Sequence, residues 1–261
     1  MTRDKSKLTS IILLTFNQLE LTKKCIESIG AYTEVPYELI IVDNNSTDGT
    51  KKYLEIYKQR STVNIKVIYN KTNKGFSRST NQGIKIAQGD FLLFLNNDVV
   101  VTQNWLNGLI ECAEISPKVG LVGPYTNMAY NSQKIAVPYR NMKQMRIFAA
   151  YISMKNNKAY KKVNNLNAFC LLVNKRVINS VGLLDEKFGP GGYEDLDYCW
   201  RTIRSGFTNM IACNVFVHHV GGQGYAPNGL DHEKLLKRNR AIFIKKWKKK
   251  VLENLEKEIY K

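Results

Sequence analysis

The sequence predicts an α/β fold in which a mixed, mostly parallel sheet is flanked by helices. Short, continuous apolar runs recur along the N-terminal part of the chain, as expected of strands that are buried on both faces. Each run ends in polar residues, and a segment with helical spacing of apolar residues follows. Strands that alternate with helices indicate βαβ units. At 261 residues, 44% of them hydrophobic, the chain is long enough to bury a full core.

Four apolar runs predict strands in this part of the chain. The first, Ser10–Phe16, is continuous and ends at polar Asn17. The next two cover Glu38–Val42 and Asn64–Asn70. The fourth lies in Leu92–Val101, LLFLNNDVVV, where three polar residues separate two apolar stretches.

The segments between these strands predict helices. Residues 19–32 place apolar side chains at helical spacing, namely Leu21, Cys25, Ile26 and Ile29. A second helix is expected from about Thr50 to Lys58, and the polar residues 71–89 read as a loop that runs into a helix.

From about Gly123 the alternation weakens. Residues 124–148 are polar, aromatic and irregular, which is typical of a binding region or a mobile loop. Strand and helix return in residues 166–182, and a Gly/Pro turn then precedes a helix whose first turn is acidic, with Glu194, Asp195 and Asp197. The last predicted strand, in residues 210–222, contains His218 and His219 towards its end.

The C-terminal residues 233–261 are strongly basic, with apolar residues at helical spacing, among them Ile244, Trp247, Val251, Leu255 and Ile259. One interpretation is a helix that docks through its apolar stripe and leaves its basic face in solvent. The other is a helix that lies on anionic lipid, with Phe243 and Trp247 in the headgroup zone.

Composition limits the partners and the compartment. The 39 Lys and Arg against 22 Asp and Glu give a net charge of +17, which favours nucleic acid, an acidic membrane surface or phosphorylated small molecules. The five cysteines lack CxxC spacing, which argues against a disulfide scaffold or a zinc site and fits a reducing compartment. No secretory signal and no run of about 18 apolar residues occurs. We therefore expect a cytoplasmic protein, with peripheral association with the membrane as an option.

Polar clusters follow three of the predicted strands, at residues 15–17, 43–48 and 96–98. Because ligands of parallel sheets bind beside the carboxyl ends of the strands, these clusters predict one shared site. Asp98 suits a metal that also binds a diphosphate, since such a site needs few hard oxygen ligands from the protein. Asn96 and Asn97 are neutral ligands or hydrogen-bond donors at most, and a plain turn is the alternative.

Other polar groups have a structural and a functional interpretation. Asp43 is expected to face a ligand, whereas Asp48 is expected to cap the next helix. Acids at the start of a helix gain ~0.3–1 kcal/mol each from its dipole, but a carboxylate there is also suited to act as a general base. The adjacent His218 and His219 point to opposite faces of a strand, so one of them is expected to face the cleft.

Six motifs together resemble family 2 glycosyltransferases of the GT-A fold, most closely a bacterial rhamnosyltransferase-like branch. The motifs occur in the order TSIILLTFNQLELTKKCIESI, YELIIVDNNSTDGT, NKGFSRSTNQGI, FLLFLNNDV, GYEDLDYCWR and VFVHHVGG. The resemblance covers roughly residues 8–225. It implies a GT-A domain over residues 1–232, with a donor half to about 123 and an acceptor half from about 124, followed by the basic helix 233–261.

The resemblance also implies roles for single residues. The nucleoside would be held by Thr15, Asn17, Asp43 and Asn45. Gly75 and Phe76 would belong to a loop over the donor, and Asn81 to the helix beside it. The DxD position is occupied by Asn96, Asn97 and Asp98, so the first acid of that motif is missing here. A divalent cation, Mn²⁺ or Mg²⁺, would be held by Asp98 with His218 or His219. Asp195 would be the general base, with Glu194 second and facing the acceptor.

The implied reaction is inverting transfer of a sugar from a UDP-, dTDP- or GDP-linked donor to a hydroxyl of a glycan, lipid-linked or protein acceptor. The net charge of +17 fits an acceptor at the inner face of the membrane. A catalytically weak or dead nucleotide-sugar-binding module is the alternative that Asn96 raises. A nucleotidyltransferase is disfavoured because it would need a Gly-rich triphosphate loop near the first strand, and LLTFNQLELTKK has no glycine. A membrane-surface or nucleic-acid binding module is disfavoured because no RNA-binding signature occurs. We expect no nucleic-acid partner.

Overall fold

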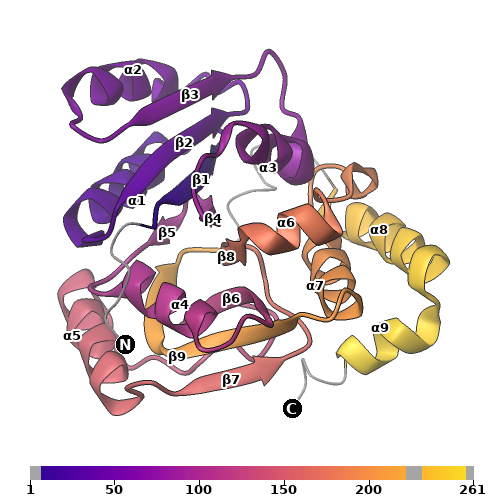
Figure 1. Ribbon diagram of the computed structural model, residues 1–261. Coiled ribbons are helices and arrows are strands. Elements are labelled where there is room, and N and C mark those ends of the chain that lie inside the picture. Colours follow the sequence, from indigo (N-terminus) through magenta and orange to yellow (C-terminus); the bar gives the residue numbers. More distant parts are fainter. Residues whose placement is uncertain (1–6, 222–230, 257–261) are drawn as a thin grey trace.

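The computed structural model describes residues 7–221 and 231–256, and its strands form one sheet (Figure 1). Among the described residues the strand order is β3-β2-β1-β4-β8-β6-β9-β5, with β7 paired to β9. The strands are β1 (Thr9–Thr15), β2 (Tyr37–Asp43), β3 (Ile65–Tyr69), β4 (Phe91–Asn96), β5 (Val99–Val100), β6 (Val119–Thr126), β7 (Tyr160–Val163), β8 (Cys170–Asn174) and β9 (Thr208–His219).

The parallel strands β3, β2, β1 and β4 make up the N-terminal half of the sheet, as the apolar runs predict. β8 joins β4 in the antiparallel direction and connects this half to β6 and β9. Thr15 of β1 pairs with Asp43 of β2, and Leu14 with Asn96 of β4. The polar residues that end these three strands therefore lie at one edge of the sheet.

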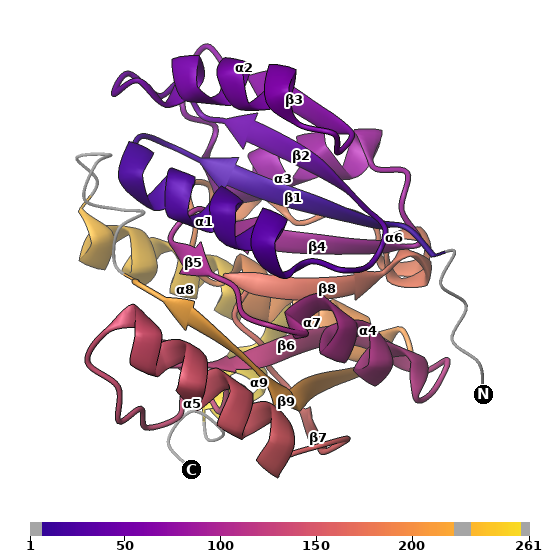
Figure 2. The same ribbon diagram turned by 90° about the vertical axis from the view of Figure 1, so that its left-hand side faces the viewer.

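Helices cover both faces of the sheet (Figure 2). One face packs against α1, α2 and α4, and the other against α3, α6 and α7. The helices are α1 (Leu19–Tyr32), α2 (Thr50–Arg60), α3 (Gly75–Ile86), α4 (Trp105–Glu114), α5 (Met142–Lys155), α6 (Lys175–Val181), α7 (Glu194–Arg204), α8 (His232–Trp247) and α9 (Lys249–Glu256), with a short 3₁₀ turn at Glu186–Phe188.

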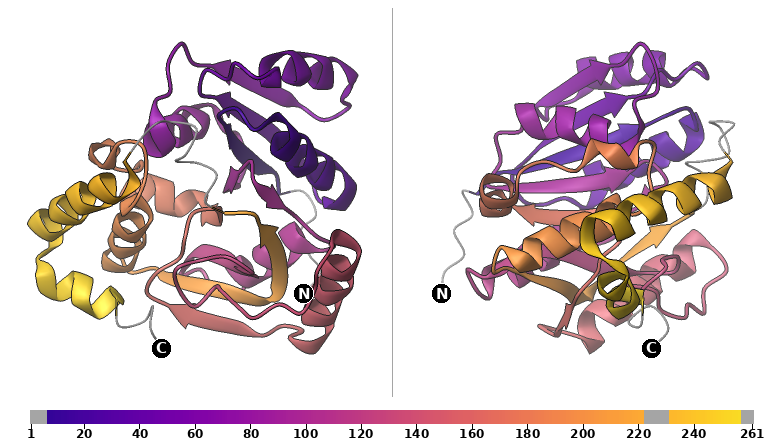
Figure 3. Two further views of the ribbon diagram at one scale, coloured as in Figure 1. Left: turned by 180° about the vertical axis from the view of Figure 1, so that it is seen from behind. Right: turned by 90° about the vertical axis from the view of Figure 1, so that its right-hand side faces the viewer.

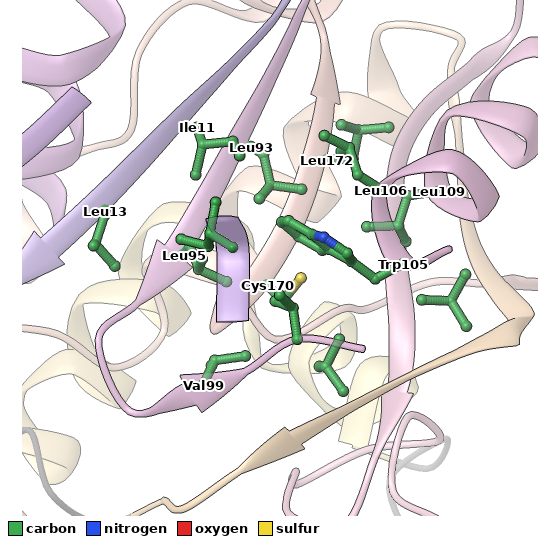
Figure 4. Packing of buried hydrophobic residues seen from close by; sticks show 14 of the residues in the cluster. Ile11, Leu13, Leu93, Leu95, Val99, Trp105, Leu106, Leu109, Cys170 and Leu172 are labelled. Carbon is green, nitrogen blue, oxygen red and sulfur yellow. The ribbon is translucent and has the colours of Figure 1, made fainter. Parts of the chain in front are cut away.

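The core on the first face is centred on Trp105 of α4 (Figure 4). Its ring is fully buried among Leu93, Cys170 and Leu172, and its indole N–H donates to Thr33 Oγ1 at 3.1 Å. The N–H is thereby satisfied although the ring lies in the core, as a buried tryptophan requires. This packing fixes β4 and β8 beneath the polar edge.

Helix α5 is not predicted from the sequence, where residues 124–148 read as irregular. Asn141 caps the helix by accepting a hydrogen bond from the Gln144 N–H at 3.0 Å. Met145, Ala149 and Ile152 are buried and follow one another at helical spacing. The pattern is hidden in the sequence because further apolar residues lie on the outer face of the same helix.

The C-terminal segment docks against the domain, beside α7 (Figure 3). Phe243 is fully buried, and the Trp247 indole N–H donates to Asp197 Oδ1 of α7 at 2.7 Å. The lipid-facing interpretation of these two aromatic residues is therefore wrong. The expected single helix is also interrupted, since Lys248 has a φ of 71° between α8 and α9. Leu255, for its side chain, and residues 257–261 lie outside what the structure describes.

No helix in the described part of the chain combines the length and the apolar character that crossing a membrane requires.

Candidate active site

A cavity of about 750 Å³ opens at the polar edge of the sheet. Both Asp98 and Asp195 line it, so the two carboxylates that the sequence singles out share one cleft. The predicted residues that border the cavity are Thr15, Gly75, Phe76, Asn96, Asn97, Asp98, Glu194, Asp195 and His219. The predicted residues that do not border it are Asn17, Asp43, Asn45, Asn81 and His218.

Asp98 and His219 meet at the wall of this cavity because β5 pairs with β9 in the register Val99 to His219. Asp98 Oδ1 lies 3.3 Å from His219 Nε2. Asp98 is 6% exposed, and within the described chain its Oδ1 atom accepts no hydrogen bond. A buried carboxylate oxygen without a donor is a costly arrangement unless a ligand completes it.

The His219 ring is held on three sides. It stacks on Phe169 with a centroid distance of 4.7 Å, and Nδ1 lies 3.0 Å from the Met128 carbonyl oxygen. Burial lowers the pKa of His219, but the Asp98 carboxylate and the Met128 carbonyl outweigh burial, and the pKa lies above 6.5. In the neutral ring Nδ1–H donates a hydrogen bond to the Met128 carbonyl oxygen, so the lone pair of Nε2 points towards Asp98.

His218 points to the opposite face of β9 and is not part of the site. Its Nδ1 atom lies 2.6 Å from the Tyr139 hydroxyl oxygen, and the two rings meet edge to face. Burial, and then the neighbouring His219, lower its pKa, although Asp98 opposes this. The alternation of side chains along a strand therefore selects His219 for the cleft, which the sequence leaves open.

Two residues predicted to hold the nucleoside, Asp43 and Asn17, make hydrogen bonds within the fold and do not border the cavity. Asp43 is fully buried and accepts hydrogen bonds from Thr15 Oγ1 and the Ser46 N–H, both at 3.1 Å. Asn17 Oδ1 accepts from the Thr47 N–H at 2.8 Å. The cavity is lined here by Asn44, a residue not predicted for the site although it stands beside Asp43 in the motif.

Asp48, Asn45 and Asn81 also serve the fold. Asp48 accepts from the N–H groups of Leu19 and Thr50 at 2.8 and 3.2 Å, as expected of a cap. Asn45 accepts from Lys51 Nζ at 3.1 Å. Asn81 is 2% exposed and exchanges two hydrogen bonds of 3.0 Å with the Leu184 backbone.

Asn96 and Asn97 differ in their contacts, although both border the cavity. The Asn97 amide donates to Thr22 Oγ1 at 2.9 Å and so ties the edge of the sheet to α1. Asn96 is held through its backbone N–H, which donates to the Phe169 carbonyl at 2.9 Å. Phe169 thus fixes both the strand end before Asp98 and the His219 ring.

Two glycine-containing loops meet over the cavity. Gly75 has a φ of +76°, and a Cβ atom there would lie 2.5 Å from Pro190 Cα. The Phe76 N–H donates to the Pro190 carbonyl at 3.0 Å. The first turn of α3 is therefore packed on the loop before α7, and only glycine fits at their contact.

Glu194 and Asp195 begin α7 and line the cavity together. Asp195 Oδ2 accepts from the Asn167 amide at 3.0 Å, and Oδ1 from the Leu196 N–H at 2.8 Å. Burial raises the pKa of Asp195, and these donors oppose the rise. Glu194 is more buried, at 7% exposed, and burial followed by repulsion from Asp195 raises its pKa to about 8. The two carboxyl groups titrate as a coupled pair, and the two hydrogen bonds to Asp195 favour the ionised form of Asp195.

The comparison with protein families decides the class. The model of glycosyl transferase family 2 matches residues 10–182, which is more than half of the chain. The chain belongs to this family. The glycosyltransferase AglE of Haloferax volcanii is 27% identical over 214 residues, covering 80% of this chain and 66% of that protein. A second relative, from Methanococcus voltae, is 28% identical over 208 residues, covering 76% of this chain and 62% of that protein. It is a dolichyl N-acetyl-alpha-D-glucosaminyl phosphate 3-beta-D-2,3-diacetamido-2,3-dideoxy-beta-D-glucuronosyltransferase.

Solved structures confirm the fold. GalNAc-T7 with UDP, GalNAc and Mn²⁺ superposes with a TM-score of 0.74 at 15% identity, over 95% of this chain and 50% of that one. The mannosyltransferase PcManGT of Pyrobaculum calidifontis, in complex with GDP-Man and Mn²⁺, superposes with a TM-score of 0.67 at 16% identity. The match covers 93% of this chain and 66% of that one. The fold is thus the GT-A fold that the motifs imply, and the chain spans only part of the length of these relatives.

Helix α8 forms part of the cavity wall in this family member, beyond the residues that the family model matches. His232 and Leu236 line the cavity. Asn239, which is fully buried, reaches under the loop before α7, and its amide nitrogen lies 2.7 to 3.0 Å from the carbonyl oxygens of Phe188, Gly191 and Gly192. The sequence signal for this role is one polar residue among the apolar positions of the helix.

Asn239→Leu should lower the stability of the fold and weaken the site. Carbonyl groups that lose a buried donor cost ~1–3 kcal/mol, and the loop that leads into Glu194 at the start of α7 would lose its support. We expect a lower free energy of unfolding in urea and a higher KM for the donor. Lys237→Ala, an exposed position on the same helix, is the matched control. Unchanged stability and KM in Asn239→Leu would show that the contact is incidental.

The raised pKa of Glu194 predicts a pH dependence of stability. An acid whose folded pKa exceeds its unfolded pKa stabilises the fold below the unfolded value, near 4.5, and this contribution is lost as the pH rises through about 8. At about 1.4 kcal/mol per pKa unit the loss is ~5 kcal/mol at most, because Asp195 shares the titration. Glu194→Gln should flatten the free energy of unfolding between pH 4.5 and 8. An equally steep profile in this variant would contradict the assignment.

Proposed function

We propose that the protein is an inverting glycosyltransferase that moves a sugar from a nucleoside diphosphate sugar to an acceptor hydroxyl, with Asp195 as general base. The observation that carries the proposal is the position of Asp98 and Asp195 on one cavity in a family 2 chain. A reaction of this kind needs positive charge at the leaving diphosphate and a proton acceptor at the incoming hydroxyl. One cleft offers groups suited to both tasks.

In the proposed mechanism Asp195 accepts the proton of the acceptor hydroxyl as that oxygen attacks C1 of the sugar. The hydrogen bonds from Asn167 and Leu196 orient the carboxylate and favour its ionised form against the effect of burial. Glu194, protonated at neutral pH, can donate a hydrogen bond to the acceptor. The C1–oxygen bond to the diphosphate breaks as the new bond forms on the opposite side, which inverts the anomeric centre.

Asp98 and His219 fit a divalent cation. Within the described chain no three His, Cys, Asp or Glu side chains group as a complete metal site, so the diphosphate would have to supply further ligands. Asp98 Oδ1 and His219 Nε2, which lie 3.3 Å apart, are the ligand atoms that such an ion would use. Mn²⁺ or Mg²⁺ bound there would stabilise the charge that develops on the leaving diphosphate.

Donor and acceptor are proposed at the level of class. The solved neighbours hold UDP or GDP-Man, which supports a nucleoside diphosphate donor without choosing its base. A lipid-linked acceptor is favoured over a glycan or protein acceptor by the dolichyl phosphate substrate named for the Methanococcus voltae relative. The five cysteines are free and buried, which supports work in a reducing compartment such as the cytoplasm.

A thermal-shift screen tests donor, metal and class together. UDP, dTDP and GDP would each be added with and without Mn²⁺ or Mg²⁺, and one nucleotide with metal should raise the melting temperature. A ligand at 100 times its dissociation constant stabilises by ~2.7 kcal/mol. UTP, dTTP and GTP are added in a parallel arm, and stabilisation by a triphosphate but by no diphosphate would sink the proposal.

Asn96 specifically favours one rival, a nucleotide-sugar-binding module without turnover, because it stands where the motif has its first acid. The two are separated by donor hydrolysis in the presence of Mn²⁺. Slow release of nucleoside diphosphate supports the enzyme, whereas binding without any release over hours supports the module.

A further inference from the structure

Helix α5 presents apolar side chains on the face that points away from the sheet. Its inner face packs on β9 (Figures 1 and 2). On the outer face Ile147 is 64% exposed, Tyr151 52% and Met154 81%, and these three residues form the α5 stripe. They follow one another at spacings of four and three residues, so they lie along one side of the helix.

Cations border the α5 stripe. Lys143, Arg146 and Lys155, the α5 cations, are exposed on the same helix. The wider segment, residues 115–184, contains no Asp or Glu and eleven basic residues, which supply +11 of the net charge of +17. These are Lys118, Lys134, Arg140, Lys143, Arg146, Lys155, Lys158, Lys161, Lys162, Lys175 and Arg176. An exposed apolar stripe in a field of one sign is an unusual surface for a freely dissolved protein.

We propose that α5 lies on an anionic lipid surface, with the α5 stripe in the headgroup region and the α5 cations against the lipid phosphates. An amphipathic helix with apolar residues on one face and Lys or Arg beside them binds at such an interface. Each cation near the surface contributes electrostatic attraction, and the apolar side chains leave water.

Other occupants fit this face less well. A second copy of the chain that docked through the same helix would place its α5 cations next to those of the first copy. The like charges would repel, because residues 115–184 contain no acid to compensate them. Nucleic acid would use the cations and leave the stripe exposed. The C-terminal helix α8 lacks the aromatic side chains for the role, because Phe243 is buried and Trp247 is bonded to Asp197.

The stripe is coupled to the cavity through its own helix. Phe148, on the inner side of α5, packs against Tyr139, which bonds His218 next to His219. The segment before α5 contributes Tyr130 and Asn131 to the cavity wall. Lipid contact would therefore hold the part of the chain that borders the acceptor side. The surface argument itself does not depend on the proposed function.

Vesicle flotation with the full chain tests the proposal. The probes are phosphatidylcholine vesicles with and without about a third phosphatidylglycerol. The protein should float with the anionic vesicles and stay behind with the neutral ones. Ile147→Ser, Tyr151→Ser and Met154→Ser combined should weaken the apparent affinity at least about tenfold. Lys143→Glu, Arg146→Glu and Lys155→Glu combined should weaken it by about a hundredfold, at about fivefold or more per cation.

The matched control reverses three exposed lysines of α8, Lys234, Lys237 and Lys245, and so changes the net charge by the same amount. This control should keep most of the binding. Circular dichroism checks the fold of each variant, and Met154→Ser alone serves if the triple variant does not fold. The proposal is overturned if the parent does not bind anionic vesicles, or if the α8 control loses binding and the α5 variants keep it. A dimer in light scattering that the stripe variant abolishes would also overturn it in favour of self-association.

Discussion

Asp195→Asn should reduce the rate of sugar transfer by a factor of about 10² to 10⁴, which is the usual contribution of a general base. The amide that replaces the carboxylate has nearly the same shape, and its one carbonyl oxygen can still accept from Asn167, so the fold should remain intact although the Leu196 N–H loses its partner. The variant also removes a carboxyl group whose pKa burial raises, and its stability at neutral pH should not fall. The measurement is transfer under saturating donor, with donor binding followed separately by calorimetry.

The neighbouring acid provides the comparison for this prediction. Glu194→Gln should lose less activity, because Glu194 with a pKa of about 8 is mainly protonated at neutral pH and a glutamine amide still donates a hydrogen bond. Glu20→Gln, at an exposed position on α1, is the matched control for an acid-to-amide change. If Asp195→Asn transfers sugar at the parent rate, or if Glu194→Gln is the more damaged variant, the base is wrongly assigned.

The edge of the sheet where the site lies could be predicted from the sequence because parallel strands end together. Apolar runs fix β1, β2 and β4, and the residues that follow them must meet in space. The position of Asp98 follows from this rule without any coordinates. The role of Asp43 does not follow, because its carboxylate faces either a ligand or a nearby hydroxyl, and the Thr15 hydroxyl takes one of its oxygens.

Contacts between distant parts of the chain set the limits of the sequence reasoning. The choice of His219 over His218 depends on the pairing of β9 with the two-residue strand β5. The apolar residues of β5 do not show which strand it pairs with. Asn239 and Asn167 act through single hydrogen bonds across the fold, and an asparagine in a sequence does not show its partner. The sequence pattern does not indicate helix α5 because its outer face is also apolar, and that same feature is the basis of the proposed lipid contact.

The sequence pattern of the C-terminal segment correctly predicts a helix with an apolar face, but it does not show which surface that face packs against. Within the described chain its apolar residues Ile244, Trp247 and Val251 are partly buried around Phe243, as the docked interpretation expects, and the surface they cover includes α7 and the 3₁₀ turn that precedes it. The helix therefore supports the cavity instead of following the domain as an appendage. We propose that the catalytic domain includes α8, so a chain cut at residue 232 would lose part of its site.

Asp98→Asn should abolish metal-dependent binding of nucleoside diphosphate and lower transfer by about 10³-fold. The loss of several kcal/mol of charge stabilisation at the leaving group, at about 1.4 kcal/mol per factor of ten, gives this magnitude. Asparagine keeps the size of the side chain but removes the negative charge that Asp98 directs at the cation. Calorimetric titration of the nucleotide with and without Mn²⁺ measures the effect, and binding without metal should change little.

The two adjacent histidines separate a metal role from a general disturbance of the fold. His219→Gln should weaken metal-dependent nucleotide binding, because it removes the Nε2 atom 3.3 Å from Asp98. His218→Gln should lose the contact with Tyr139 and with it some stability, while the metal dependence stays at the parent level. Equal effects of both variants on metal dependence would place the cation elsewhere. If Asp98→Asn bound nucleotide with metal as tightly as the parent, the idea that this strand end holds a cation against a diphosphate would have to be given up.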